Sequence, residues 1–423
     1  MTLHQTLHRP ESTVCGCDDT PGLVPVDQAI ERGLALISQV REVELLALGA
    51  ATGRVLARDV ASPVPFPLFD NAAMDGYAVR SADLEGPGPW QLPVKGSVRA
   101  GDAPSLMPDL DAAMRILTGA PVPQGADAVV AQEHVSRDGE TVLISARPRM
   151  GQHIRRCGDD LAAGMPLLSA GRRLGAREAA ALAGAGVSDV PVRRRLRIAI
   201  LCSGNELVAP GTPLASGQIW DVNHAMLTAA LDQRWITLMA FPAYADDPDA
   251  LCRAMSLAAA QADILITTGG VSVGDEDHMA RVIDRLGGKI EVTGLAMKPG
   301  KPLSIGTLDG ALWLGLPGNP VAAFVTWHVL GQVLAGYMAG ATSTGPAKTL
   351  AALALPMRHK PGRCEYRPAN IVGHDARGVM QVACKENVGS HRIAQLAGAD
   401  ALVIIPSEIE HMGRGDLVEV MPL

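Results

Sequence analysis

The sequence predicts a multidomain α/β plus β protein whose centre is a doubly wound, parallel α/β sheet. Three observations predict this fold class. Strand-like apolar runs alternate with helical stretches from residue 196 to about 345, short alternating runs separated by Gly/Pro turns occupy 43–168, and short β-like runs return after about 346. A chain of 423 residues is long for one domain, so about two to four domains are expected.

The individual elements follow from periodicity. The predicted helices are 26–40, which carries an apolar stripe, then 177–185, 222–233, 248–261, 277–285 and the core helix 321–338. The predicted strands are 128–132, 141–146, 165–168, 198–202, 236–241, 264–266, 292–297, 311–316, 401–405 and 417–421. The last two predict a small C-terminal barrel or sandwich, and 190–195 is expected to be a basic linker.

Composition excludes several classes of protein. The net charge of −7 argues against nucleic-acid binding, and the basic run 193–197 is interpreted as a solvated junction. Residues 1–24 lack the apolar centre of a signal peptide, and 1–21 are expected to be disordered. Seven scattered cysteines indicate reduced thiols, with no assigned role for Cys15 and Cys17. We therefore expect a soluble, cytoplasmic protein that does not enter a membrane.

Three glycine-rich loops, at 267–274, 298–302 and 316–320, each directly follow an apolar run. Glycine lets backbone amides approach a ligand closely, and a helix that opens after such a loop adds partial positive charge. Asn319 is a good N-cap and Pro320 suits the first helical position, so a helix is predicted to begin there. Loops at strand C-termini form the ligand crevice of an open α/β sheet, which predicts a phosphate or oxyanion site.

Carboxylates fall on the same predicted edge: Glu206, Asp246 or Asp247, and Asp277. Carboxylates repel an anion unless a hard cation bridges them, and Mg²⁺ does this with one or two carboxylates plus substrate phosphates. Lys298 and Lys301 would neutralise further negative charge. Each motif also has a structural interpretation, since Asp247 suits a helix cap and both the 269–274 and 298–302 loops suit plain turns. The convergence of the motifs on one edge favours the site.

The β-rich part carries three further motifs. Asp75-Gly76 predicts a tight turn that presents a carboxylate, for which a structural role is the common alternative. Thr118-Gly119-Ala120-Pro121 offers a hydroxyl and amides, and the segment from Arg155 to Asp160 packs two cations and two carboxylates together. Arginine there suits a planar or tetrahedral anion, and a local salt-bridged turn is the alternative.

These motifs, in this order, resemble the molybdopterin molybdenumtransferases (the MoeA and gephyrin E-domain family) from about residue 22 to 423. The resemblance rests on Met74 to Ala78, Thr118 to Ala120, Arg155 to Asp160, Ser203 to Leu207, Gly269 to Gly274, Lys298 to Pro302 and Leu316 to Pro320. It implies a linking and dimerisation domain (22–61 with 164–193), a β-rich insertion domain (62–163), a molybdopterin-binding α/β domain (194–345) and a C-terminal β-barrel domain (346–423). It further implies a homodimer whose active site lies between the α/β domain of one subunit and the insertion of the other.

The implied activity inserts molybdate into adenylated molybdopterin, with Mg²⁺-dependent release of AMP. The implied catalytic residues are Asp75, Asp160, Glu206, Asp246, Asp247, Asp277, Lys298 and Lys301, with Glu206 and Asp277 holding Mg²⁺. The implied substrate-binding residues are Thr118, Arg155, Ser203, Gly269, Gly270, Ser272, Gly274, Asp275, Pro317, Gly318, Asn319 and Pro320. A molybdopterin adenylyltransferase and molybdoenzyme acceptors are the implied protein partners.

The sequence departs from the family pattern at a few positions. Asp159 replaces a common glutamate, His278 replaces a common tyrosine, and the C-terminal segment 390–397 lacks a usual glycine and serine. Two alternative functions remain open at this point: a related molybdopterin- or nucleotide-processing enzyme with the same α/β domain, and a catalytically silent scaffold of this fold. The preference between molybdate and tungstate is also left open.

Overall fold

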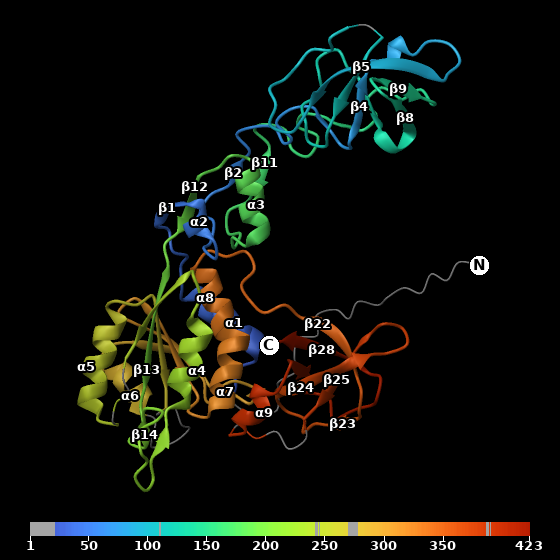
Figure 1. Ribbon diagram of the computed structural model, residues 1–423. Helices are drawn as coiled ribbons and strands as arrows, with labels where there is room; N and C mark the ends of the chain where they lie inside the picture. Colours follow the sequence, from blue (N-terminus) through green and yellow to red (C-terminus); the bar gives the residue numbers. More distant parts are fainter. Residues whose placement is uncertain are drawn as a thin grey trace.

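The computed structural model describes residues 22–109, 111–241, 244, 246–269, 278–385, 389 and 391–423. The predictions made for residues 1–21 and for 270–277, including those for Gly270, Ser272, Gly274, Asp275 and Asp277, lie outside the described residues. Figure 1 shows an elongated chain, with a β-rich region at one end and an α/β unit beside a C-terminal β unit at the other.

The α/β unit is a six-stranded sheet in the order β16-β13-β17-β21-β20-β18. Its strands are β13 (Leu196–Cys202), β16 (Ile236–Ala240), β17 (Ile264–Thr268), β18 (Lys289–Thr293), β20 (Ser304–Leu308) and β21 (Ala311–Leu316). The pairs β13–β16, β13–β17 and β17–β21 are parallel. Because β13, β17 and β21 are almost wholly buried, each reads as a continuous apolar run in the sequence.

The expectation of a parallel sheet throughout was wrong for β20, which runs antiparallel to both β18 and β21. Only Asp309 and Gly310 separate β20 from β21, and both have positive φ values of 48° and 83°. A two-residue Asp-Gly turn with positive φ joins the strands of a hairpin and leaves no room for a crossover helix. The predicted strand 292–297 also ends early, at Thr293, before Gly294 with its φ of 80°.

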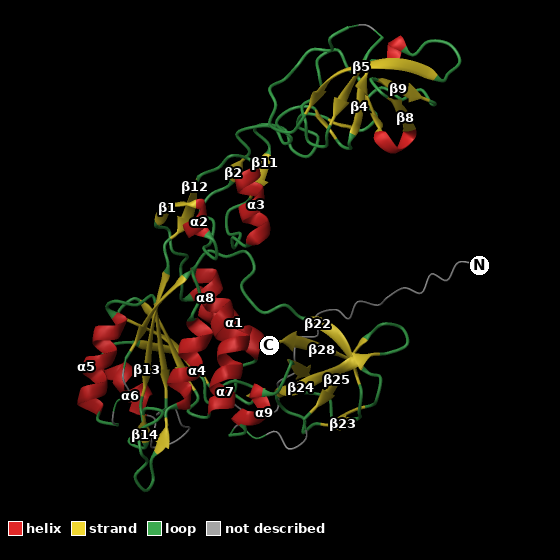
Figure 2. Ribbon diagram, viewed as in Figure 1, coloured by secondary structure: helices red, strands yellow, loops and turns green. Residues whose placement is uncertain are grey.

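Helices cover both faces of this sheet, as a doubly wound fold requires (Figure 2). One face buries apolar residues from α4 (Val222–Leu231) and from the helix that runs through α7 (Pro320–Thr326) and α8 (Gln332–Met338), with a π-helical turn between them. The other face is covered by α5 (Pro248–Ala259) and α6 (His278–Arg285). The helix Pro320–Met338 is long and apolar enough to cross a membrane, but 78% of it is buried. It is a core helix, as predicted.

A linking region lies between the α/β unit and the β-rich region (Figure 1). Strand β1 (Val43–Ala47) pairs with β12 (Asp189–Arg193), and β2 (Val60–Ala61) pairs with β11 (Pro166–Leu168). The helices of the region are α2 (Leu48–Ala51) and α3 (Ala176–Gly184). The basic stretch expected as a linker at 190–195 is thus mostly strand β12. The predicted helix 26–40 is shorter, because α1 covers only Val26–Ala35 and packs on α8.

The β-rich region contains a six-stranded sheet in the order β7-β4-β6-β5-β9-β8. Its strands are β4 (Gly76–Val79), β5 (Trp90–Val98), β6 (Ala113–Ile116), β7 (Ala128–Ala131), β8 (Val135–Asp138) and β9 (Thr141–Ile144). A short pair, β3 (Asn71–Ala72) with β10 (Ile154–Arg155), lies beside the Asp75 turn in sequence. The loops that carry Asp75, Thr118 and Asp160 therefore belong to one region.

The C-terminal strands close into a barrel, which resolves the choice between barrel and sandwich. The strand order is β24-β25-β22-β28-β26, and β26 pairs back onto β24. The strands are β22 (Thr349–Leu353), β24 (Cys364–His374), β25 (Met380–Cys384), β26 (Ala401–Ile405) and β28 (Leu417–Pro422). The short strand β19 (Met297–Lys298), from the α/β unit, adds to β24 in parallel. This addition brings the Lys298 loop onto the barrel.

A partly buried ion cluster fixes the junction between the linking region and the α/β sheet, and it gives the first testable prediction. Asp263 accepts hydrogen bonds from Arg194 at 2.7 and 2.9 Å and from Arg197 at 2.7 and 3.0 Å. Partial burial opposes ionisation, but the two arginines outweigh it and hold the pKa of Asp263 below the ordinary 3.8. We expect Asp263→Asn to lower the free energy of unfolding at pH 7 by about 1–3 kcal/mol in chemical denaturation.

The pH dependence of this loss checks its cause. A carboxyl whose pKa is lower in the folded than in the unfolded protein stabilises the fold at pH values above its unfolded pKa. This stabilisation disappears as the pH falls through its folded pKa. The difference between the variant and the parent should therefore shrink below pH 3.8. The matched control is Asp249→Asn, whose pair with Arg285 is about 60% exposed on both sides and should contribute almost nothing. An equal loss in both variants would contradict the assignment.

Candidate active site

The ends of β13, β17 and β21 lie in register, so their following loops meet at one edge of the sheet. Cys202 pairs with Thr268, and Thr268 pairs with Leu316. The residues that directly follow β13, β17 and β21 are Ser203, Gly269 and Pro317. Because the strand ends are level, these three residues lie side by side. The predicted convergence of Ser203, Gly269, Pro317 and Gly318 is thus present among the described residues. We call this group of loops the crevice.

Buried hydrogen bonds lock the crevice loops to one another. The Asn223 amide donates to Thr268 Oγ1 at 2.7 Å and to the Gly318 carbonyl at 2.7 Å, and the Thr268 hydroxyl donates to the Pro317 carbonyl at 3.1 Å. Both Asn223 and Thr268 are buried. These three bonds tie the loops together, while the Asn223 Oδ1 is buried without a hydrogen-bond partner among the described residues. Asn223 was not predicted as a site residue from the sequence. Its position in the first turn of a helix, two residues after the N-cap Asp221, could have indicated it.

Glycine is needed where the loops approach each other. Gly269 has a φ of 90°, and a Cβ there would lie 2.1 Å from the Ser203 carbonyl oxygen. A Cβ on Gly318 would lie 3.7 Å from Gly269 Cα, so these two loops are also in van der Waals contact. Beside them the Ser203 Oγ is buried and has no hydrogen-bond partner among the described residues. An unpaired hydroxyl between two glycine loops can donate to a ligand oxygen.

The carboxylates of the crevice divide into two kinds. Asn205 and Asp246 bond reciprocally, because each backbone N–H donates to the other's side chain, at 3.3 and 3.1 Å. The Asp246 Oδ1 is buried without a partner among the described residues, and Glu206 has its carboxylate over Gly204. Asp247 instead accepts the backbone N–H groups of Asp249 and Ala250 and caps α5. The capping interpretation of Asp247 is therefore the one the geometry favours.

These oxygens have the chemistry that Mg²⁺ prefers. Hard oxygen donors suit Mg²⁺, which needs only one or two carboxylates and takes its other ligands from water and phosphate. The unpartnered Asp246 Oδ1 beside the exposed Glu206 fits such a requirement. Within the described residues no group of three His, Cys, Asp or Glu side chains is gathered for a metal, so an all-protein cage is absent there.

Lys298 and Lys301 line a separate cavity of about 460 Å³ together with His359, Lys360 and Arg363 of the C-terminal unit. We call it the basic cavity. The sequence placed the two lysines with the glycine loops, and the structure instead sets them against the barrel. The missed cations had a usable signal, because Lys360-Pro361-Gly362-Arg363 repeats the spacing of Lys298-Pro299-Gly300-Lys301.

A buried carboxylate lies beside the basic cavity. Glu365 is 1% exposed, and it accepts Arg367 at 3.0 and 3.1 Å and approaches Lys298 at 3.4 Å. Burial alone would raise its pKa, but Arg367, Lys298 and His359 outweigh burial and lower the pKa of Glu365. Glu365 is therefore ionised and holds Lys298, which leaves Lys301, Lys360 and Arg363 as cations for an oxyanion.

In the β-rich region, Asp75 and Thr118 form one unit. Asp75 Oδ1 accepts both the Thr118 backbone N–H and the Thr118 hydroxyl, each at 2.7 Å. These two bonds, with the charge of Arg115, lower the pKa of Asp75 against a small opposing desolvation. The Asp75-Gly76 turn thus presents an ionised carboxylate at neutral pH.

The second acidic segment of this region is mostly open to solvent. Arg156 and the Cys157 amide both bond Asp70, which agrees with the salt-bridged-turn interpretation for Arg156. Arg155 and Asp160 are exposed. Figure 1 shows the whole β-rich region beyond the linking region from the α/β sheet, so one chain does not bring Asp75, Thr118, Arg155 or Asp160 to the crevice.

Comparison with known proteins assigns each of these parts. The model of the MoeA N-terminal region (domain I and II) matches residues 24–186, the probable molybdopterin binding domain matches 199–336, and the MoeA C-terminal region (domain IV) matches 351–423. Together they cover most of the chain in the family order.

The chain belongs to the MoeA family.

Relatives in this family span almost the full length of the chain. A molybdopterin molybdenumtransferase from Haemophilus influenzae is 34% identical over 95% of this chain and 98% of its own length. Molybdopterin molybdenumtransferase 2 from Mycobacterium tuberculosis is 35% identical over 89% of this chain and 94% of its own. The crystal structure of a MoeA protein of molybdopterin biosynthesis from Pyrococcus horikoshii OT3 aligns with a TM-score of 0.80 at 27% identity, over 95% of this chain and all of that one. The MoeA fold predicted from the sequence is confirmed.

The glycine approach in this MoeA crevice gives a second prediction. Gly269→Ala should displace the end of β13, because the added Cβ would overlap the Ser203 carbonyl, and should lower the free energy of unfolding by about 2 kcal/mol or more. Gly287→Ala is the matched control, since Gly287 has a similar φ of 75° with no atom within 4 Å. Thermal denaturation of both variants measures the difference. Equal losses would mean that backbone strain alone, and not the close approach, explains the glycine.

A third prediction concerns the ionisation of Asp75. Thr118→Val removes the hydroxyl donor and leaves the backbone donor, so the pKa of Asp75 should rise towards the ordinary 3.8. Carbon-13 NMR titration of labelled aspartate carboxyls measures the shift. Thr118→Ser keeps the hydroxyl and should leave the titration unchanged, and a pKa that moves equally in both variants would contradict the role of the hydroxyl.

Proposed function

We propose that this chain is a molybdopterin molybdenumtransferase, which inserts molybdate into adenylated molybdopterin and releases AMP in molybdenum cofactor biosynthesis. The observation that carries the proposal is the arrangement on one chain of MoeA-type units in family order, with a locked glycine crevice and a cation-lined cavity at the α/β unit. A crevice rich in amides and a cavity rich in cations suit two oxyanions, the phosphoanhydride and molybdate.

The α/β residues have two roles in this proposal. Lys301, with Lys360 and Arg363 of the adjoining barrel, holds molybdate or phosphate oxygens, because cations that line a cavity neutralise a tetrahedral dianion, and Lys298 adds its charge beside them while it is paired with Glu365. Ser203, Gly269, Pro317 and Gly318 line the crevice for the adenylated substrate, together with Asn319 and Pro320 at the start of α7. We extend the crevice to Gly270, Ser272, Gly274 and Asp275, which continue its central loop in the sequence.

We assign Mg²⁺ to Glu206 and Asp277, with Asp246 beside them and Asp247 confined to its cap. The ion would neutralise charge on the phosphoanhydride when bound. Asp246 keeps a buried oxygen that has no partner among the described residues, and its reciprocal bonds with Asn205 orient its carboxylate. The carboxylates thus organise the cation end of the crevice.

We further propose that a homodimer completes the site. Asp75, Thr118, Arg155 and Asp160 lie in a region that one chain holds away from its own crevice (Figure 1). A partner subunit would supply them, with Asp75 and Asp160 positioning metal or water. Exposed apolar side chains in the same region, at Leu68, Phe69 and Met74, favour contact with another protein surface.

The proposed reaction balances in atoms. A water oxygen adds to phosphorus as the phosphoanhydride breaks, which gives AMP and the molybdopterin phosphate. Two molybdate oxygens leave as two waters when both dithiolene sulfurs bind molybdenum. Their four protons come from the two thiols, from the hydrolysis, which releases one, and from solvent, which supplies one. Because the hydrolysis consumes one water, one water is released in total. We place the enzyme in the cytoplasm, where the five described cysteines would remain the free thiols that they are here, and we propose a molybdopterin adenylyltransferase and molybdoenzymes as its protein partners.

The fourth prediction tests the reaction itself. Purified protein with adenylated molybdopterin and Mg²⁺ should release AMP only when molybdate is added, as measured by chromatography. Asp75→Ala and Asp277→Ala should each abolish the release while the thermal denaturation midpoint stays unchanged. Molybdate-independent release would favour a related nucleotide-processing enzyme, absence of release would favour a silent scaffold, and full activity in either variant would remove that residue from the site.

The fifth prediction tests the shared site. Asp75→Ala and Glu206→Gln would each inactivate both sites of their own homodimer. Mixed dimers would contain one site with both lesions and one intact site, so random mixing should restore roughly a quarter of the parent activity. The control mixes Asp75→Ala with Asp160→Ala. Both substitutions lie in the β-rich region, so each site of the mixed dimer receives one altered β-rich region and stays inactive. Recovery in the control, or none in the test mixture, would contradict a site built from two chains.

A further inference from the structure

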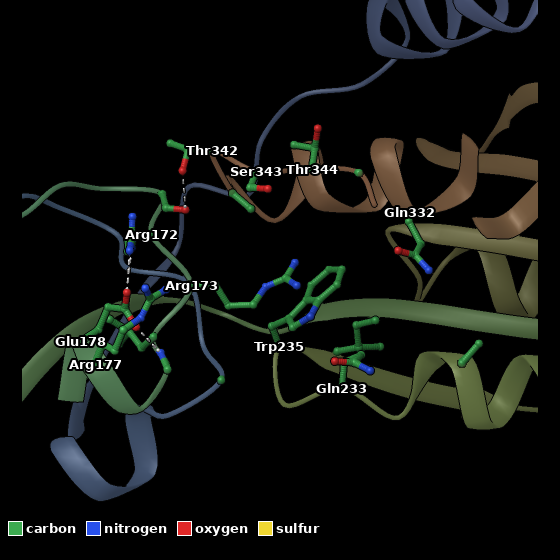
Figure 3. Close-up of a pocket in the computed structure, with 18 of the residues that line it drawn as sticks. Arg172, Arg173, Arg177, Glu178, Gln233, Trp235, Gln332, Thr342, Ser343 and Thr344 are labelled. Carbon is green, nitrogen blue, oxygen red and sulfur yellow. Dashed lines mark hydrogen bonds and ion pairs between the residues drawn. The ribbon is translucent and has the colours of Figure 1, made fainter. Parts of the chain in front are cut away.

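A cavity of about 730 Å³ lies at the edge of the α/β sheet opposite the crevice. It adjoins Trp235, which directly precedes β16, whereas the crevice follows the carboxyl ends of the parallel strands. Its walls come from the linking region, from the α/β unit and from the segment 341–345 that leads to the barrel (Figure 3). Its size lies within the range of small-molecule pockets. We call it the junction cavity.

Three arginines line the junction cavity, and one of them is already neutralised. Arg172 pairs with the buried Glu178 at 2.8 Å, and Glu178 also accepts the Gly175 backbone N–H at 2.9 Å. The Arg172 bond is the largest of the interactions that lower the pKa of Glu178, so the glutamate is ionised. One positive and one negative charge therefore cancel within this wall.

The other two arginines have no counterion. Among the described residues, no carboxylate lies within ion-pair distance of Arg173 or Arg177. Arg173 lies over the Trp235 ring at 4.8 Å, and Figure 3 shows the two side chains together within the cavity. Burial of this guanidinium lowers the pKa of Arg173. A partly desolvated cation without a carboxylate gains free energy from a bound anion.

Polar side chains occupy the rest of the wall. Gln233, Gln332 and Ser343 lie around the cavity in Figure 3. Thr342 is tied to the Gly171 carbonyl through its backbone N–H at 3.0 Å and its hydroxyl at 3.3 Å, so the segment 341–345 is held against the linking region. Amides and hydroxyls of this kind suit the hydroxyl groups of a sugar or polyol.

We propose that the junction cavity is a second ligand site, which binds a phosphate dianion on Arg173 and Arg177, as free phosphate or as the terminal group of a phosphorylated sugar. The residual charge of two matches a dianion. Guanidinium groups bind phosphate oxygens through paired hydrogen bonds. The volume exceeds that of a phosphate group, and the amide and hydroxyl wall provides partners for an attached sugar.

Calorimetric titration of the full-length protein with ribose 5-phosphate and, separately, with inorganic phosphate tests the site. We expect binding that weakens roughly tenfold or more in Arg173→Gln and in Arg177→Gln, because each removes one charge-assisted contact. Tighter binding of ribose 5-phosphate would identify the sugar phosphate as the ligand class, and equal binding would identify free phosphate. Trp235 fluorescence gives an independent signal from the cavity.

Two controls separate this site from the basic cavity and from unfolding. Lys298→Gln with Lys301→Gln should remove only the binding that belongs to the basic cavity and leave the binding that depends on Arg173 and Arg177. Arg253→Gln, which changes an exposed arginine on α5 outside both cavities, should alter neither. Arg173→Lys keeps the charge over the Trp235 ring and should retain part of the affinity if the protein tolerates the change. Absence of binding, or binding that survives Arg177→Gln and disappears with the two lysines, would overturn the proposal.

Discussion

The register of three parallel strands is the constraint on which the crevice depends. β13, β17 and β21 end level with one another, and the Asn223 amide bonds both Thr268 and Gly318, so each loop leaves the sheet from a fixed point. Because the strands are buried on both faces, a slip of one residue would exchange the side chains that pack into the two clusters and would break these bonds. Gly269 then approaches the Ser203 carbonyl at a distance that only glycine permits. The crevice is therefore a consequence of sheet packing.

The same reasoning separates what the sequence could predict from what it could not. Continuous apolar runs with short loops predicted the strands Ala311–Leu316 and Ala401–Ile405 without error, because burial on both faces leaves a direct trace in the sequence. The antiparallel β20 was missed although Asp309-Gly310 marks a hairpin, because no strand was predicted between 297 and 311. Strand β12 was interpreted as a linker because its partner β1 lies about 140 residues earlier in the sequence.

The candidate site shows the same division. The meeting of Ser203, Gly269 and Pro317 could be predicted, because a parallel sheet places strand ends together whatever the side chains are. The ion pair of Lys298 with Glu365 could not be predicted, nor could the placement of Lys301 and Arg363 around one cavity, because both depend on β19 joining β24 across two folding units. Asp247 had two interpretations from sequence alone, and the choice required the positions of the Asp249 and Ala250 backbone N–H groups. The chemistry of side chains at one sheet edge could thus be predicted from the sequence, whereas contacts between folding units could be identified only in the structure.

Charge is distributed so that each cavity has cations without nearby counterions. In the basic cavity one buried carboxylate, Glu365, is shared by Arg367, Lys298 and His359. The three further cations, Lys301, Lys360 and Arg363, have no carboxylate partner among the described residues. A buried carboxylate with several cationic partners stays ionised and orients them, whereas one cation for each anion would produce a neutral wall. The acidic crevice, by contrast, keeps Glu206 and the free Asp246 oxygen away from any arginine or lysine partner among the described residues. The cations of the basic cavity and the carboxylates of the crevice therefore belong to two different groups of side chains, of which the first is built from both the α/β unit and the barrel.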